Sequence, residues 1–195
     1  MKKLLTFALA ALAALTLRAG EEDAVKNVFT TVNTLACELK MGEVLRHYTE
    51  DFVEVGASGK KITKAEAVKL AAIVDVIGKE DASVAEIWAA IAGMQGRTPS
   101  AEELAKAGEL EKKPESRRQF QAMRAQMKTV MQHKLREQAA SFRFISVRVD
   151  GDRAVAVYRE KDVESPKWIE HRCELVKRNG QWLIRRDNGR YVDAQ

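Results

Sequence analysis

Residues that can do chemistry gather on one face of a hairpin near the C-terminal end of the chain. The Asn-Gly dipeptide at 179–180 accepts positive φ at both central positions of a two-residue loop, which predicts a tight antiparallel hairpin. Pairing across that loop places Cys173 opposite Arg186. His171 and Trp182 fall on the same face because side chains alternate along a strand. We therefore expect these four side chains to point toward one side of the sheet and to bind a ligand there.

His171 and Arg186 each allow two interpretations. A histidine near neutral pH can act as a general acid or base, but one hydrogen-bonded in the core or at a cavity rim fits the same position. Arg186 can hold an anionic ligand or pair with a carboxylate at the sheet edge. The alternate positions are expected to face solvent: Glu170, Arg172, Glu174, Arg185 and Asp187.

No motif assigns the chain to a common enzyme class. The sequence has no P-loop, no dinucleotide glycine fingerprint, no HExxH and no Gly-x-Ser-x-Gly. Three histidines and two cysteines exclude a Cys/His-rich zinc framework. We therefore expect no cofactor and no metal site.

The two cysteines leave two states open. An even pair, Cys37 and Cys173, favours a disulfide in an oxidising compartment. At about 100° per residue, however, Cys37 lies off the apolar stripe of its helix and faces away from the sheet that contains Cys173. The geometry favours free thiols.

The first 19 residues have the layout of a secretory signal peptide. Lys2 and Lys3 form a positive start, a 14-residue apolar run extends from Leu4 to Leu17, and Ala19 is a small residue suited to cleavage. The run is shorter than the roughly 20 residues that a membrane-spanning helix needs. We expect a mature periplasmic or secreted chain starting near residue 20; an uncleaved anchor and an ordinary first helix are the alternatives.

Removing the leader changes the charge of the protein. The 195 residues are 46% hydrophobic and 31% charged, which suits one globular domain, and the net charge is +5. The leader holds three basic residues and no acid, so the mature chain carries +2. Between Lys112 and Arg136 there are eight basic residues and one acid, or +7, which leaves −5 for the remainder.

This basic amphipathic segment can bind an anionic membrane surface or an acidic partner. In the other interpretation its methionine stripe packs on neighbouring helices while the basic side stays solvated. Nucleic acid is not an expected partner, because aromatic residues are few and the compartment is wrong.

Periodicity predicts an α+β fold with helices on one face of an antiparallel sheet. Apolar spacing predicts a helix over 23–40 and a short one over 43–49. Three capping boxes begin helices that end near residues 78, 93 and 114, and a long helix continues to about residue 140: Thr63/Glu66, Ser83/Glu86 and Ser100/Glu103. Strands are predicted over 51–55, 142–149, 153–159, 167–178 and 181–186. Residues 79–140 would form an all-helical insertion before the main sheet.

Three segments resemble the nuclear transport factor 2-like superfamily, the cone-shaped fold shared with SnoaL-like polyketide cyclases and ketosteroid isomerase: residues 48–53, 59–66 and 175–184. The resemblance spans about 23–78 and 141–188. It implies a curved sheet packed on N-terminal helices, a pocket between them with Tyr48 close by, and a homodimer through the outer face of the sheet as one assembly. The catalytic carboxylate and tyrosine of ketosteroid isomerase are not matched residue by residue.

The sequence therefore predicts a non-catalytic domain that binds a small apolar or partly anionic ligand, or a protein partner. The first alternative is a cavity enzyme for proton transfer, dehydration or cyclisation that uses His171 and Tyr48. The second is membrane-surface association through residues 112–136. The candidate ligand-binding residues are His171, Cys173, Arg186, Tyr48 and Trp182.

Overall fold

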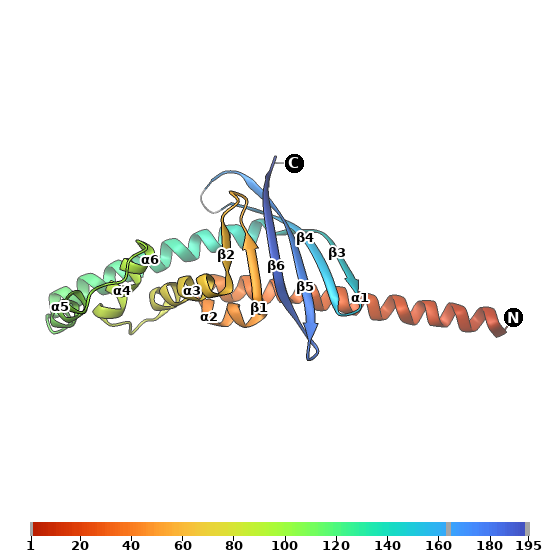
Figure 1. The fold of residues 1–195 in the computed structure, drawn as a ribbon, viewed down its shortest axis with the longest axis horizontal. Coiled ribbons are helices and arrows are strands. Elements are labelled where there is room, and N and C mark those ends of the chain that lie inside the picture. Colours follow the sequence, from red (N-terminus) through yellow and green to blue (C-terminus); the bar gives the residue numbers. More distant parts are fainter. Residues whose placement is uncertain (1, 163–164, 194–195) are drawn as a thin grey trace.

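The computed structural model describes residues 2–162 and 165–193, without the side chains of residues 2–18 and 94. Within that part, helices and strands follow one another in the order drawn in Figure 1. The helices are α1 (Lys2–Cys37), α2 (Met41–Val44), a 3₁₀ turn (Leu45–His47), α3 (Lys64–Gly78), α4 (Val84–Met94), α5 (Ala101–Glu111) and α6 (Pro114–Ser141). The strands are β1 (Tyr48–Val55), β2 (Lys61–Thr63), β3 (Arg143–Asp150), β4 (Arg153–Lys161), β5 (Trp168–Arg178) and β6 (Gln181–Val192).

Helix α1 runs through the predicted leader and its cleavage site. Leader removal and export stay predictions. Across the described residues, no helix combines the length and the apolarity that crossing a membrane requires.

The predicted α+β class with a curved sheet is confirmed. One sheet has the strand order β2-β1-β6-β5-β4-β3, and its neighbours are antiparallel except for β1, which pairs with β6 in parallel. The parallel pair joins strands separated by most of the chain, so no hairpin fixes their relative direction. Figure 1 shows the sheet across the middle of the molecule, with α4 and α5 beyond one side of it.

The predicted tight turn between β5 and β6 is confirmed. Asn179 has a φ of 51° and Gly180 a φ of 78°, the backbone that a two-residue hairpin loop requires. Several element boundaries differ from prediction, and α1 runs from Lys2 to Cys37 rather than over 23–40. Strand β1 begins at Tyr48, which shortens the helical segment before it, and β6 continues past Arg186 to Val192.

A β-bulge between Glu174 and Leu175 changes the register of this hairpin. Beyond the bulge, Cys173 pairs with Asp187 and Glu174 pairs with Arg186. A one-residue shift moves every following side chain to the other face of the sheet. The predicted inward position of Arg186 and outward position of Asp187 are therefore both wrong.

The main core lies between α1 and the inner face of the sheet. Val25, Val28 and Phe29 of α1 pack there against residues of β1 and β4–β6. Glu21 ties the start of this contact to the sheet, since its carboxylate accepts hydrogen bonds from Trp182 Nε1 at 2.9 Å and Lys177 Nζ at 2.6 Å. Glu21 lies two residues after the predicted cleavage site, so a mature chain would retain this contact.

All three predicted capping boxes are present, at the first residues of α3, α4 and α5. Helices α3, α4 and α6 contribute to a second cluster around buried Leu39, Ile77 and Ala90, against which the α6 residues Met127, Met131 and Leu135 pack. Met127 and Met131 of the basic segment are thus used for helix packing, whereas Met123 is exposed.

Two of the basic residues in α6 are used inside the protein. Arg124 is 7% exposed and donates hydrogen bonds to the carbonyl oxygens of Ile77 and Lys79. Lys128 donates to the Gly78 carbonyl oxygen at 3.1 Å. These carbonyls lie at the C-terminal end of α3, where cations are favourable. Membrane association through α6 stays a prediction. Fewer of its basic side chains are available for a membrane surface than the sequence suggests, because Arg124 and Lys128 bind backbone carbonyls.

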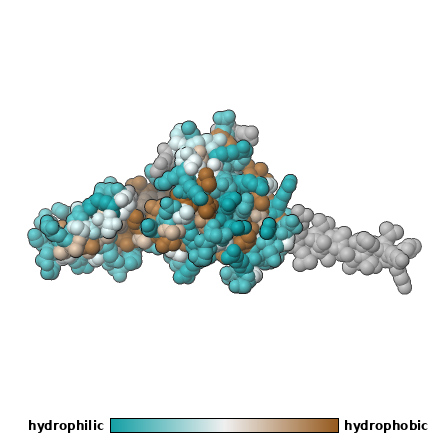
Figure 2. Space-filling model, in the orientation of Figure 1, coloured by the Kyte–Doolittle hydropathy of each residue, from teal (hydrophilic) through white to brown (hydrophobic). Residues whose placement is uncertain are grey.

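The cysteines are free thiols, Cys173 being buried and Cys37 partly buried. The sheet face turned toward the viewer in Figure 2 is largely hydrophilic. Arg148, Arg172 and Arg186 are exposed in the described structure. A homodimer through the outer face of the sheet stays a prediction.

Leu39 provides a test of the second cluster. It is 2% exposed yet has a φ of 61°, a conformation that costs a non-glycine residue roughly 1–2 kcal/mol. Leu39→Ala should lower the free energy of unfolding by about 2–5 kcal/mol through lost packing. Leu39→Gly should be no less stable than Leu39→Ala, because glycine adopts positive φ without that cost. Urea unfolding measures both.

The matched control is Leu70, half-exposed within α3. There, the glycine variant should be about 1 kcal/mol less stable than the alanine variant. The same order at Leu39 would contradict the assigned backbone strain.

Candidate functional site

A cavity of about 170 Å³ lies between α1, the end of α6 and the inner face of the sheet. Its apolar wall comes from Phe29, Val32, Phe142 and Ile184. Its polar lining comes from Asn33, Tyr48, Glu54, Gln138, Tyr158, Glu160, His171 and Asp187. An engineered apolar cavity of about 150 Å³ accommodates benzene, so this cavity suits a ligand of about one six-membered ring.

His171 is the centre of the polar lining and is 7% exposed. Its Nδ1 lies 3.1 Å from Asp187 Oδ2, and its Nε2 lies 3.5 Å from Glu160 Oε1. The Tyr158 ring stacks on the imidazole with centroids 4.7 Å apart, which fixes the plane of the histidine ring.

The two carboxylate oxygens of Asp187 differ in their hydrogen bonds. Its Oδ2 accepts a hydrogen bond from Tyr158 Oη at 2.7 Å in addition to the His171 contact. Its Oδ1 is buried without a hydrogen-bond partner, and so is His171 Nε2. Buried polar atoms are nearly always hydrogen-bonded in native proteins. These two atoms are therefore available to a molecule that enters the cavity.

Two further carboxyls have raised pKa values. Burial raises the pKa of Glu160 to about 7, against the opposing effects of His171 and of the hydrogen bond from Gln138 Nε2, which is 2.6 Å from Glu160 Oε1. Burial, with the charge of Asp187, also raises the pKa of Glu54. Near neutral pH the site therefore contains a carboxyl that can either hold or release a proton.

The pKa of His171 moves in the opposite sense to that expected from burial alone. Burial lowers it, but the hydrogen bond to Asp187 and the charges of Asp187, Glu160 and Glu54 outweigh burial and raise it above the usual value. The imidazole is therefore held in its cationic form to higher pH than a free histidine.

The electrostatic sign of the cavity differs from the sequence prediction. Among the residues that the structure describes, three carboxyls and one histidine line it, and no lysine or arginine does. Arg186, the only cation predicted there, lies on the outer face because of the bulge. The expectation of a partly anionic ligand depended on Arg186 and loses its support.

The structure brings together two of the five predicted site residues. His171 and Tyr48 line the cavity, and burial raises the pKa of the Tyr48 phenol, which keeps it protonated. Cys173 and Trp182 belong to the buried core instead, and they do not line the cavity. Cys173 is fully buried beneath the site, and burial raises the pKa of its thiol, so it is not a reactive cysteine.

Five polar residues of the lining are not among the predicted site residues: Glu54, Gln138, Tyr158, Glu160 and Asp187. Tyr158 and Glu160 could have been found, because Ala154, Ala156, Tyr158 and Glu160 alternate along β4 and face inward together. Asp187 could not have been found in this way, since nothing in the local sequence marks the bulge.

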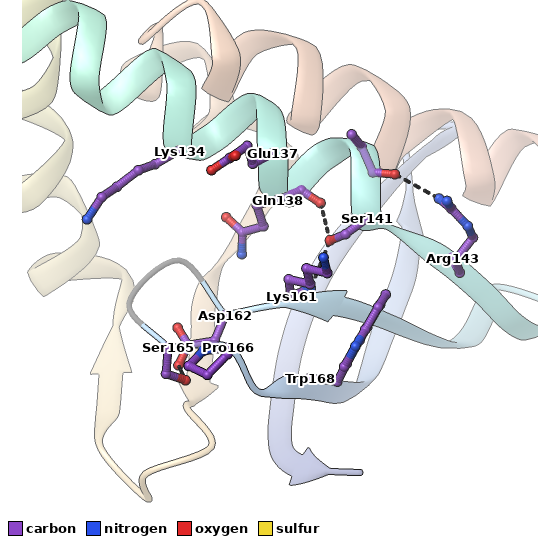
Figure 3. Close-up of a pocket in the computed structure, with 11 residues that line it drawn as sticks. Lys134, Glu137, Gln138, Ser141, Arg143, Lys161, Asp162, Ser165, Pro166 and Trp168 are labelled. Atoms are coloured by element: carbon purple, nitrogen blue, oxygen red, sulfur yellow. Dashed lines mark hydrogen bonds between the residues drawn. The ribbon is translucent and has the colours of Figure 1, made fainter. Parts of the chain in front are cut away.

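A larger groove of about 750 Å³ lies outside the cavity, between the end of α6 and residues 161–162 and 165–168. Figure 3 shows Gln138 projecting from α6 toward the groove, with Lys161, Asp162 and Trp168 on the opposite wall. Gln138 lines both the groove and the cavity, so the two spaces meet at its side chain.

Among the described residues, no three or more His, Cys, Asp or Glu side chains are arranged to hold a metal ion.

No protein-family model matches the chain, and no curated protein matches it in sequence. Among solved structures, the chain is similar to an NTF-2-like protein of unknown function from Silicibacter pomeroyi, with 11% identity over 89% of this chain and 98% of that one and a TM-score of 0.46. An NTF2-like protein of unknown function from Shewanella baltica gives 11% identity, 90% and 97% coverage and a TM-score of 0.46. A ketosteroid isomerase-like protein from Erwinia carotovora atroseptica is 10% identical over 89% of this chain and 98% of that one, with a TM-score of 0.43. No residue role transfers to this chain at these identities.

The raised pKa of Glu160 predicts how stability depends on pH. Because the folded protein binds the Glu160 proton more tightly than the unfolded chain, the free energy of unfolding should fall as pH rises from about 4.5 through 7. His171 acts in the same direction, since its stabilising charge is present below the ordinary histidine pKa and is lost as pH rises through the raised value. In Glu160→Gln the fall should be smaller, by up to roughly 3 kcal/mol.

Urea unfolding between pH 4.5 and 8 measures this difference. Glu174→Gln is the control, because Glu174 pairs with Arg186 in the register of the outer face, away from the cavity. A pH dependence in Glu160→Gln identical to that of the parent protein would show that Glu160 does not titrate as described.

Proposed function

We propose that the protein binds a small molecule bearing a protonated amine, or several hydrogen-bond donors, in the cavity around His171. The observation that carries this proposal is a cavity lined by three carboxyls, with no lysine or arginine, in which Asp187 Oδ1 is buried without a hydrogen-bond partner. A charge-assisted hydrogen bond from an ammonium group satisfies such an oxygen better than a neutral donor does. The sequence predicts that this binding takes place outside the cytoplasm, in the mature chain.

The aromatic lining supports the same ligand class. Phe29 contacts the rings of Phe142 and Tyr158 at centroid distances of 5.9 and 5.2 Å, and these three side chains border the carboxyls. Aromatic faces attract cations as well as apolar groups. An anion, in contrast, would enter a space whose fixed charges repel it.

Benzylamine and benzoate test the sign of the ligand at nearly constant size. Isothermal titration calorimetry at pH 7 should detect binding of benzylamine and no binding of benzoate. Glu160→Gln should weaken benzylamine binding about tenfold, the effect of losing one charge-assisted hydrogen bond. Glu174→Gln, on the outer face, should leave the affinity unchanged. Preferential binding of benzoate would refute the proposal.

One observation favours proton transfer as a second candidate function. The Glu160 carboxyl, with a pKa of about 7, lies 3.5 Å from His171 Nε2, and both groups face the cavity. An acid or base is most effective when its pKa lies near the working pH. Tyr48, protonated in the same cavity, can donate a hydrogen bond to an oxygen that gains negative charge. This arrangement suits removal of a proton next to a carbonyl group.

Exchange of solvent deuterium into cyclopentanone, followed by ¹H NMR, tests this second function. Exchange should exceed the uncatalysed rate and fall at least 100-fold in Glu160→Gln, because general acid–base groups contribute factors of about 10² to 10⁴. His171→Gln should lower it as well. Exchange that is equal in the parent protein and in Glu160→Gln would remove the enzyme hypothesis for this substrate class.

A further inference from the structure

We propose that the ligand is a dipolar molecule, whose ammonium group occupies the inner cavity and whose carboxylate or other anionic group lies in the outer groove. This inference rests on the proposed binding of an amine and adds the second charge of the ligand. It assigns a binding role to Lys134 and Lys161.

The inner cavity and the outer groove are adjacent. Gln138 lines both, and its Nε2 donates a hydrogen bond to Glu160 Oε1, so its amide separates the cavity carboxyls from the groove. Its backbone oxygen accepts from Ser141 Oγ at 2.6 Å, and Ser141 Oγ accepts from the Lys161 N–H at 2.8 Å (Figure 3). These bonds hold the end of α6 against β4, next to Lys161.

The groove has cationic side chains, whereas carboxyls line the cavity. Lys134, Arg143 and Lys161 line it, and none of the three has an ion-pair partner among the residues the structure describes. Arg143 is engaged in another way, because its guanidinium donates to the carbonyl oxygens of Ala140 and Phe142. The two lysine ammonium groups remain available to an anion.

The acids of the groove do not neutralise these lysines. Asp162 accepts hydrogen bonds from Ser165 Oγ at 2.8 Å and Tyr191 Oη at 3.3 Å. Glu137 lies 3.8 Å from His133 one turn earlier on α6, with its side chain 67% exposed. The Lys161 ammonium lies 5.9 Å from the Trp168 ring centroid, so an apolar surface adjoins the cationic one.

The cavity and the groove offer complementary charges to the two ends of one ligand. The cavity lining contains only carboxyls and one histidine as ionisable charge carriers near neutral pH, whereas two unpaired ammonium groups line the groove beyond Gln138. A ligand with one charge of each sign satisfies both sides, but a simple amine leaves the groove unused. Complementary charges on both sides of the boundary act mainly on specificity.

Three probes of matched chain length test this inference: pentylamine, 6-aminohexanamide and 6-aminohexanoate. All three present an ammonium group, and the last two differ only in the charge of the far end. Calorimetry at pH 7 and low salt should show that 6-aminohexanoate binds about tenfold more tightly than 6-aminohexanamide. In the double variant Lys134→Gln/Lys161→Gln this preference should disappear while pentylamine binding is unchanged.

Lys106→Gln is the control variant, because Lys106 is an exposed lysine of α5 that pairs with Glu102 away from the groove. It should retain the tenfold preference. Equal binding of the amide and the carboxylate by the parent protein would overturn the dipolar ligand and leave amine binding intact. Failure of all three probes, pentylamine included, would overturn both proposals. A preference that persists in the double variant would show that these two lysines are not the anion site.

Discussion

The buried contact between His171 and Asp187 is the interaction on which the arrangement of the site depends. Burying a charge without a partner costs several kcal/mol, and this cavity gathers three carboxyls. The imidazole, 3.1 Å from Asp187, offsets one of them, and Glu160 lowers the remaining cost by keeping its proton up to a pH of about 7. Tyr158 contacts both members of the pair, because its ring stacks on His171 and its hydroxyl donates a hydrogen bond to Asp187. The charge on each group is therefore set by its neighbours.

A backbone irregularity makes this contact possible. Without the bulge, the register of the hairpin would place Arg186 beside Cys173 on the inner face and Asp187 on the outer face, as the sequence suggests. The cavity would then hold a cation where it now holds an anion. One extra residue in one strand thus determines whether a cation or an anion stands at this position of the cavity lining.

Local signals in the sequence predicted most of the elements, because capping boxes and Asn-Gly turns act over a few residues and are satisfied locally. They did not predict the bulge, which no local feature of the sequence marks. They also did not reveal that Arg124 and Lys128 cap the end of α3, because a charge count cannot show which cations are used internally. Glu160 is an intermediate case. Its inward position follows from the alternation of side chains along β4, but its contact with Gln138 joins residues 22 positions apart and is not marked in the local sequence.

The cavity and the outer groove have different structural supports, because the groove depends on helix α6. His171, Glu160 and Asp187 lie on adjacent strands, so the geometry of the charged pair depends on the sheet. Gln138 and Lys134 lie on α6, whose position depends on the packing of Met127 and Met131 against Leu39 and Ile77 and on the hydrogen bonds from Arg124 and Lys128. Substitutions in the α3–α6 cluster should therefore move the boundary between cavity and groove while leaving the His171 contacts intact. The proposed ligand selection and the proposed proton chemistry therefore depend on different parts of the fold, so a substitution can alter one without the other.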